Sequence, residues 1–123
     1  VYAFPWVPMM DVLRDADAVV TNAGINTINE CIRFGVPPVV YSLGSNDQNG
    51  TAARVAYHGV GVVGDLAESS AVTMMAEIEQ ALHDTSIRSN IDQMQRRFAA
   101  YERDQRAVQC IEAMLAGGYT APR

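Results

Sequence analysis

Short apolar segments alternate with helical segments along the first half of this chain, and this alternation constrains its fold more than any other feature. Apolar runs at Ala18–Thr21, Val39–Leu43 and Val60–Val63 predict strands, and a further short strand is predicted at Val1–Phe4. Strands that alternate with helices predict parallel βαβ units, and uninterrupted apolar strands predict a sheet covered on both faces. The sequence therefore predicts an α/β fold in which helices flank a parallel sheet.

Helices are predicted between these strands and after the last one. Gly35 and the Pro37-Pro38 pair end one helix, and Gly59 ends another. The predicted helices cover Pro8–Arg14, Ile25–Phe34, Gln48–His58, a segment that Ser70 caps and that runs to about His83, a segment that Ser86 caps, and a last segment before Gly117-Gly118.

The last three predicted helices each carry an apolar stripe at helical spacing. Such a stripe either packs in the core or binds a partner, and core packing is the simpler interpretation because any packed helix has one apolar face. The stripes consist of Val72, Met75, Ile78 and Leu82, then of Ile87, Ile91, Met94, Phe98 and Tyr101, and finally of Val108, Ile111 and Leu115.

The composition allows one domain and argues against several classes of protein. A chain of 123 residues, 49% of them hydrophobic, is long enough for one core and not for two. The formal net charge is -5, and the nine basic residues, all arginine, form no basic stripe, which argues against nucleic-acid binding. No apolar run approaches the length of a membrane span, so we expect a cytoplasmic protein.

The cysteines and histidines suggest no chemistry of their own. Cys31 and Cys110 fit neither a metal-site spacing nor a disulfide framework, so both are predicted to be reduced core residues. His58 and His83 lie at or near predicted helix ends, without a catalytic candidate beside them. We therefore assign no catalytic residue and no metal site to this chain.

Three loops with polar or aromatic residues occupy the expected carboxyl ends of the predicted strands. They lie around Pro5-Trp6, at Thr21–Asn26 and at Gly44–Gln48. Ligands of parallel α/β sheets bind at this edge. The coincidence predicts a ligand site built from the three loops.

The segment Thr21–Glu30 suits an anion. Gly24 allows a ligand to approach the backbone, and the amides of Gly24 to Thr27 would point from a helix N-terminus, where a phosphate is favoured. Asn26 and Glu30 share one helix face, and a carboxylate there can accept hydrogen bonds from ribose hydroxyls. The alternative is that Asn22 or Asn26 only caps the helix and that Glu30 is solvated.

Trp6 and the Asp47-Gln48 pair are further candidates. Trp6, the only tryptophan, either stacks on a base or anchors the core. Asp47 and Gln48 supply an acid and an amide, which can bind sugar hydroxyls, or Asp47 caps the following helix. These alternatives remain open from the residues alone.

The segments WVPMMDVL and ADAVVTNAGINTINECIRFGVPPVVYSLGSNDQN resemble the donor-binding signature of UDP-glycosyltransferase-like enzymes with the GT-B fold. The resemblance is to bacterial glycosyltransferases of the macrolide and natural-product type. It is strong over residues 4–64, and the helical tail is similar to the closing helices of that family. Several spaced motifs match in order, which makes the signal specific.

The resemblance implies a role for each residue of the signature. Trp6 would stack on the nucleobase, and the backbone of Val7 would meet the edge of the base. Gly24, Ile25, Asn26 and Thr27 would cradle the diphosphate, and Glu30 would bind the ribose hydroxyls. Asp47 and Gln48 would contact the transferred sugar. Asn22 stands where the family usually has a diphosphate-contacting histidine, so this chain offers a neutral donor there.

The resemblance also implies the domain organisation. Residues 1–123 would form most of a Rossmann-like C-terminal donor-binding domain, incomplete at its N-terminus because its first strands would precede Val1. The acceptor pocket and catalytic base would belong to an N-terminal domain outside this chain or to a partner chain. The donor would be a UDP-sugar or dTDP-sugar, with no other cofactor and no metal.

Two functions of different classes follow. In the first, the chain is the donor-binding part of an enzyme that transfers a hexosyl or deoxyhexosyl group to an acceptor hydroxyl. In the second, it is a non-catalytic donor-binding subunit that needs a separate acceptor-domain partner. The matches at Trp6 and at Asp47-Gln48 argue against a third option, a related sugar-nucleotide epimerase.

Overall fold

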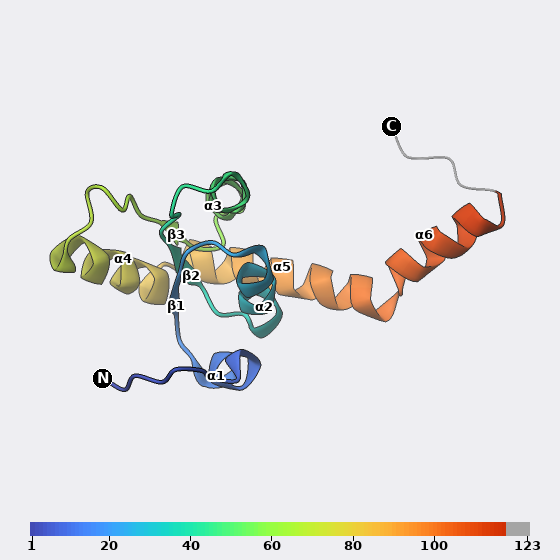
Figure 1. The fold of residues 1–123 in the computed structure, drawn as a ribbon. Helices are drawn as coiled ribbons and strands as arrows, with labels where there is room; N and C mark the ends of the chain where they lie inside the picture. Colours follow the sequence, from blue (N-terminus) through green and yellow to red (C-terminus); the bar gives the residue numbers. More distant parts are fainter. Residues whose placement is uncertain (118–123) are drawn as a thin grey trace.

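The computed structural model describes residues 1–117 of the chain, and Figure 1 shows their arrangement. Helices alternate with short strands over the first half, and three helices follow. The elements are α1 (Met9–Asp15), β1 (Val19–Thr21), α2 (Ile25–Phe34), β2 (Pro38–Val40), α3 (Asn46–His58), β3 (Val62–Val63), α4 (Ala71–His83), α5 (Thr85–Arg103) and α6 (Arg106–Leu115).

The three strands form a parallel sheet in the order β1-β2-β3. Val19–Thr21 pairs with Pro38–Val40, and Val39-Val40 pairs with Val62-Val63. The predicted α/β fold with a parallel sheet is therefore confirmed. Because the strands are parallel, their carboxyl ends lie at one edge of the sheet.

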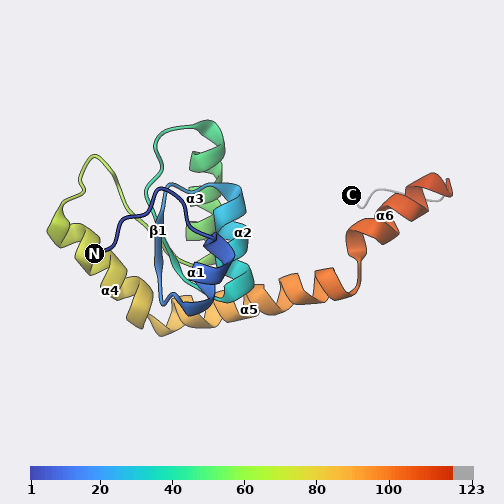
Figure 2. The same ribbon diagram turned by 60° about the horizontal axis from the view of Figure 1, so that its bottom comes forward.

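Helices cover both faces of the sheet (Figures 1 and 2). α2 and α3 lie on one face, and α4 lies on the other. β2 is buried between them, since Val40 packs toward α2 and α3 whereas Val39 packs toward α4. α5 contributes Ile87 to the α4 side and Ile91 to the opposite side.

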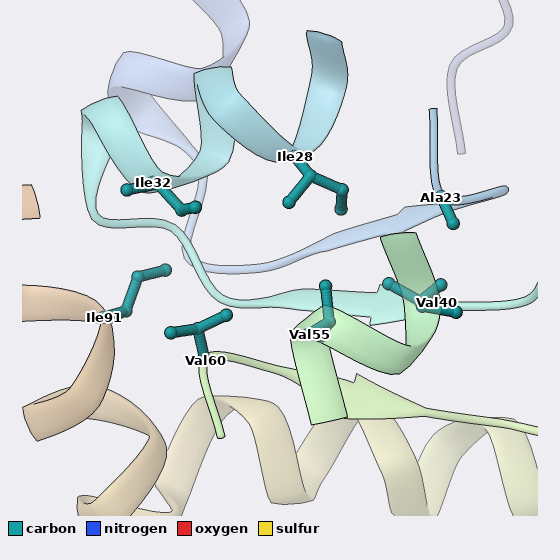
Figure 3. Close-up of a cluster of buried hydrophobic side chains, with 8 residues drawn as sticks. Ala23, Ile28, Ile32, Val40, Val55, Val60 and Ile91 are labelled. Atoms are coloured by element: carbon teal, nitrogen blue, oxygen red, sulfur yellow. The ribbon is translucent and has the colours of Figure 1, made fainter. Parts of the chain in front are cut away.

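The larger core cluster fills the space between β2, α2, α3 and α5. Figure 3 shows Ile28 and Ile32 of α2 pointing from above toward Val55 of α3 and Ile91 of α5. Met94 and Phe98 of α5 pack against this cluster and are partly buried. Its buried members are Ala23, Ile28, Ile32, Val40, Ala52, Val55, Val60 and Ile91.

The opposite face contains a polar anchor among apolar side chains. Tyr41, which follows β2, is buried with Val39, Val62 and Ala81. Its hydroxyl donates a hydrogen bond to the carboxylate of Glu77 on α4. This hydrogen bond, together with burial, raises the pKa of Tyr41 to about 12. The bond ties α4 to the carboxyl end of β2.

Several sequence predictions of helix boundaries are confirmed. α2 covers the predicted residues, and Gly35 ends it in the left-handed conformation with φ of 68°. Gly59 ends α3 in the same way with φ of 60°. Ser70 caps α4 in a reciprocal arrangement with Thr73.

The strand predicted at Val1–Phe4 is wrong. These residues form no strand within the described part of the chain, and their side chains are exposed. A strand needs a neighbour for its backbone hydrogen bonds, and residues 1–117 offer none to this segment.

The apolar stripes pack only in part. Ile87, Ile91, Met94 and Phe98 of α5 pack as predicted, but Tyr101 is exposed. On α4 the packed residues are Met74, Ile78 and Ala81, whereas the predicted Val72 and Met75 are exposed.

α6 leads away from the sheet in both views of the ribbon (Figures 1 and 2). Its stripe of Val108, Ile111 and Leu115 is exposed in this structure, so core packing of that stripe is not observed. Cys110 of α6 is also exposed, and its prediction as a core residue is wrong. Cys31 is buried as predicted, and burial raises the pKa of its thiol to about 12.

No helix within residues 1–117 is both long enough and apolar enough to cross a membrane.

The cap of α5 differs from the prediction. Asp84, not Ser86, holds the cap position, and its carboxylate accepts hydrogen bonds from the amides of Ser86 and Ile87. The hydroxyl of Ser86 donates to the same carboxylate. These donors, the hydroxyl first, hold the pKa of Asp84 below its ordinary value.

We expect Asp84→Asn to lower the free energy of unfolding at pH 7 and to have a smaller effect at pH 3. A carboxyl with a depressed folded-state pKa stabilises the fold above its unfolded pKa of about 4, and this contribution disappears as the pH falls through the folded-state pKa. Urea unfolding followed by circular dichroism at the two pH values measures the difference. Ser86→Ala is the control and should change stability less, because the two amide donors remain. An equal effect of Asp84→Asn at both pH values would contradict the cap.

Candidate functional site

The candidate site lies at the carboxyl edge of the sheet. Two hydrogen bonds continue the pairing at this edge. The Tyr41 amide donates to the carbonyl of Thr21, the last residue of β1, and the Gly64 amide donates to the carbonyl of Val40, the last residue of β2, each at 2.9 Å. The loops that follow β1, β2 and β3 therefore start side by side, in the order of the strands. The sequence predicted a ligand site of three loops at this edge. Two of them follow β1 and β2 as predicted, whereas the loop around Pro5-Trp6 follows no strand in residues 1–117.

The turn between β1 and α2 presents free backbone donors. Gly24 holds the cap position of α2, and the first bonded amide is that of Ile28, which donates to the Gly24 carbonyl at 3.0 Å. No side chain in residues 1–117 caps this helix end. The amides of Ile25, Asn26 and Thr27 thus remain available at the positive end of a ten-residue helix, where an anion is favoured.

The alternative in which Asn22 or Asn26 caps α2 is wrong, because Gly24 occupies the cap position. The side chain of Asn22 is exposed at the turn, and so is that of Asn26 in the first turn of the helix. Both carboxamides are therefore accessible from solvent next to the free amides.

Gly24 leaves space over this turn. A Cβ at Gly24 would lie 3.8 Å from Asn22 Oδ1 and 3.9 Å from Thr27 Oγ1, which is ordinary van der Waals contact. Its φ of -59° is available to any residue. Neither backbone conformation nor packing therefore requires glycine here, and its lack of a Cβ leaves the backbone of the turn accessible between Asn22 and Thr27.

Ala23 is the one feature of this turn that the sequence did not reveal. It is buried, and its φ of 68° lies in the left-handed region, which costs an alanine about 1–2 kcal/mol. Strained backbone of this kind clusters at ligand sites. Alanine has no preference for this conformation, so no local signal in the sequence marks it.

A second part of the site lies where the loop before α1 passes α2. A hollow of about 400 Å³ brings Trp6 and Val7 together with Glu30, from the second turn of α2. Trp6 is 77% exposed, so its alternative role as a core anchor is wrong. Glu30 is half-buried at the hollow rather than fully solvated. Pro8, Met9, Met10 and Asp11 complete the lining.

The third part is the loop between β2 and α3. Ser45 holds the cap position of α3, so the alternative in which Asp47 caps this helix is wrong. Asp47 lies in the first turn and is exposed. Hydrogen bonds to its carboxylate from the Ser45 hydroxyl and from nearby backbone amides hold the pKa of Asp47 below its ordinary value. Asp47 is therefore an anionic acceptor at neutral pH.

Gln48 fixes the same loop. Its Oε1 accepts a hydrogen bond from the Leu43 amide at 2.9 Å. The carboxamide nitrogen of Gln48 carries its donors on the other side of the group. The side chain thus braces the loop while keeping its NH₂ group for a ligand.

The ten predicted residues divide among three places. Trp6, Val7 and Glu30 line the hollow, Asn22 and Gly24 lie in the turn after β1 with Ile25, Asn26 and Thr27 in the first turn of α2, and Asp47 and Gln48 lie in the first turn of α3. The side chain of Ile25 points away from the candidate site. It lines an apolar pocket of about 200 Å³ between α2 and α3, together with Ile28 and Val55. Only the backbone amide of Ile25 belongs to the turn. The arrangement as a whole offers an aromatic face, a carboxylate, a set of free amides and an acid-amide pair along one edge.

The similarity to known proteins agrees with this arrangement. The family model described as "Erythromycin biosynthesis protein CIII-like, C-terminal domain" matches residues 1–114. The uncharacterized UDP-glucosyltransferase YdhE of Bacillus subtilis (strain 168) is 30% identical over 94 residues, which are 76% of this chain and 24% of that protein. The chain thus spans about a quarter of the length of this curated relative.

Two solved structures have a similar fold. The calicheamicin glycosyltransferase CalG4 matches 98% of this chain and 30% of its own, with a TM-score of 0.83 and 27% identity. The spinosyn rhamnosyltransferase SpnG, complexed with thymidine diphosphate, matches 76% of this chain and 26% of its own, with a TM-score of 0.67 and 25% identity. The resemblance to glycosyltransferases that the motifs indicated is confirmed, and the chain belongs to the family of erythromycin biosynthesis protein CIII-like C-terminal domains.

Proposed function

We propose that this chain binds a nucleoside diphosphate sugar as the donor-binding part of a glycosyltransferase. The observation that carries the proposal is the free N-terminus of α2, with room for a Cβ at Gly24 and with Trp6 and Glu30 sharing a hollow. A nucleotide needs an aromatic face for its base, an acceptor for its ribose hydroxyls and donors for its phosphates. Trp6, Glu30 and the free amides of α2 would meet these three requirements.

The diphosphate would bind at the turn between β1 and α2. The amides of Ile25, Asn26 and Thr27 donate to the phosphate oxygens, and Asn22 adds a neutral carboxamide donor. Backbone dipoles are the main stabilising groups in a chain with a net charge of -5. These dipoles are already oriented, so they need not reorient when charge develops on the leaving diphosphate.

The base and ribose would occupy the hollow beside α1. Trp6 stacks on the base, the backbone of Val7 meets its edge, and Glu30 accepts hydrogen bonds from the ribose hydroxyls. YdhE is described as a UDP-glucosyltransferase, and SpnG was solved with thymidine diphosphate. Both names support uridine or thymidine as the base.

The transferred sugar would lie against the loop after β2. Asp47 accepts hydrogen bonds from the hydroxyls of a hexosyl or deoxyhexosyl group, and the Gln48 NH₂ group donates to them. In the reaction, the acceptor oxygen bonds to the anomeric carbon and gives its proton to a general base on the acceptor side, outside this chain. The bond from the anomeric carbon to the diphosphate breaks, and its electron pair leaves with the diphosphate.

The acceptor and its base would come from an acceptor-binding domain of the same protein. A separate acceptor-domain chain is the alternative, in which this chain is a non-catalytic donor-binding subunit. A cytoplasmic location, expected from the sequence, stays a prediction.

We expect selective binding of UDP or dTDP over GDP when each is titrated into the chain by calorimetry. The purine of GDP presents a different edge to the Val7 backbone. A difference in affinity of at least about tenfold, or about 1.4 kcal/mol, is the expected outcome. Equal affinity for the three nucleotides, or no binding by a folded chain, would contradict the proposed donor site.

We expect Glu30→Ala to weaken UDP binding by about tenfold or more, the effect of losing hydrogen bonds to a charged group. The loss should be smaller for dTDP, because its deoxyribose lacks the 2′-hydroxyl. Glu112→Ala, an exposed glutamate on α6, is the matched control and should bind both nucleotides as the wild type does. Unchanged UDP affinity in Glu30→Ala would remove Glu30 from the site.

We expect Gly24→Ala to fold normally and to lose affinity for UDP by about tenfold or more. The added methyl group has room in the free protein but would fill the space that the diphosphate needs. Uridine, which has no phosphate, should bind both proteins equally. Urea unfolding checks that stability is retained, and full UDP affinity in a stable variant would place the diphosphate elsewhere.

A further inference from the structure

The apolar pocket that Ile25 lines opens between α2, α3 and α5, away from the candidate donor site. Its volume is about 200 Å³. Ile28, Ile32 and Val55, which Figure 3 shows in the larger core cluster, also line it. Because these three side chains are buried, the inner end of the pocket reaches the core.

The inside of this pocket suits an apolar group. Its buried polar residue, Thr51, already donates its hydroxyl hydrogen to the Asp47 carbonyl at 2.9 Å. A water molecule would need several polar partners, which the inner wall does not offer within residues 1–117. An apolar cavity of about 150 Å³ holds benzene, so a group of about six to eight carbon atoms matches this volume.

Polar side chains stand at the rim of the pocket instead. Asn29 of α2 and Arg54 and His58 of α3 line it and are exposed. Arg54 and His58 are four residues apart on α3, so they lie on the same face of that helix. A guanidinium and an imidazole can both donate hydrogen bonds to an anion at this rim.

A second, polar pocket adjoins the apolar one. Its volume is about 250 Å³, and it shares His58 and Met94 with the apolar pocket, so the two meet at these residues. Gln93 and Arg97, four residues apart on α5, lie on its wall and are exposed. The junction therefore has donors from two helices that are distant in the sequence.

The charge around the junction is positive. Arg54 and Arg97 line the two pockets, and no aspartate or glutamate within residues 1–117 does. The arginines that form ion pairs in this part of the chain are Arg14, Arg33 and Arg103. In a chain with a net charge of -5, two arginines without a nearby carboxylate beside an apolar pocket favour an anionic ligand.

The end of α3 does not oppose this charge strongly. The C-terminal end of a helix is negative because its last carbonyls lack partners. Here the Val55 and Ala56 carbonyls accept from the Val60 and Gly59 amides, at 3.2 and 3.1 Å. Asn90 Nδ2, in the wall of the polar pocket, donates to the Gly59 carbonyl at 3.2 Å. Arg54 and Arg97 are consequently not needed to satisfy this helix end.

We propose that the two pockets form one binding site for a small carboxylate with an apolar body of about six to eight carbon atoms, such as a medium-chain fatty acid. The body fills the apolar pocket, and Arg54, His58 and Arg97 donate hydrogen bonds to the carboxylate at the junction. The site is independent of the proposed function, since Ile25 is the one donor-site residue that lines it, and it does so with its side chain.

The test uses the full-length protein labelled with carbon-13 in its methionine methyl groups and observed by NMR. Met94 lines both pockets, whereas Met9 lines the hollow of the proposed donor site. Met94→Leu and Met9→Leu assign the two signals. The probes are octanoate, butanoate, which has a shorter body, and octylammonium, which has the same body and the opposite charge.

We expect octanoate to shift the Met94 signal in a saturable way and to leave the Met9 signal unchanged. Kd for butanoate should be at least about tenfold higher, because four methylene groups fewer enter the apolar pocket. Kd for octylammonium should also be at least about tenfold higher, because the arginines repel it.

Arg54→Gln and Arg97→Gln test the carboxylate contact. Each should raise Kd for octanoate by about fivefold or more, the effect of losing a hydrogen bond from a charged donor. Arg96→Gln is the matched control and should bind octanoate as the wild type does, since Arg96 is exposed on the same helix but lines neither pocket. The three arginines are exposed, so circular dichroism should show the wild-type fold in each variant.

Three results would overturn the proposal whether or not the protein binds a nucleotide sugar. The first is a Met94 signal that octanoate does not move. The second is an equal Kd for octanoate and octylammonium, which would mean an apolar pocket without a carboxylate site. The third is an unchanged Kd for octanoate in both Arg54→Gln and Arg97→Gln.

Discussion

The parallel pairing of β2 between β1 and β3 is the constraint on which the rest of the structure depends. Val39 and Val40 are fully buried on opposite faces of this central strand, so α4 must cover one face and α2 with α3 the other. The same pairing aligns three loops at one edge of the sheet. This alignment sets the order of the proposed phosphate and sugar positions, which follow β1 and β2, whereas the proposed base position lies between α2 and the loop before α1.

The chemistry of the proposed donor site relies on dipoles. The net charge is -5 and the nine arginines form no basic stripe in the sequence, and the resemblance implies that Asn22 stands where the family usually has a histidine. The free amides at the start of α2 therefore supply most of the favourable electrostatics. In this proposal, diphosphate binding depends on backbone geometry, which includes the strained turn at Ala23.

Motifs in the sequence predict a donor site, whereas the structure tests and partly corrects the predicted packing. The segments around Trp6, Gly24 and Asp47 carry residues whose chemistry can be judged one at a time. The strand pattern placed the segments around Gly24 and Asp47 at one edge of the sheet, but no strand in residues 1–117 precedes Trp6. Packing depends on which face of each helix meets the sheet, and this is decided by contacts between elements distant in the sequence. On α4 Met74 packs against the core instead of Met75, although the cap at Ser70 is the predicted one.

The sequence by itself determined the α/β class and the helix ends at Gly35 and Gly59, because periodicity and the special properties of glycine and proline act locally. The residues that would bind a nucleotide sugar stay a prediction from the sequence. The tertiary structure alone decided that Trp6 and Glu30 share a hollow and that an apolar pocket opens between α2, α3 and α5. The hollow and the pocket both form where segments that are distant in the sequence meet in the fold. The sequence pattern does not specify which of these segments come together.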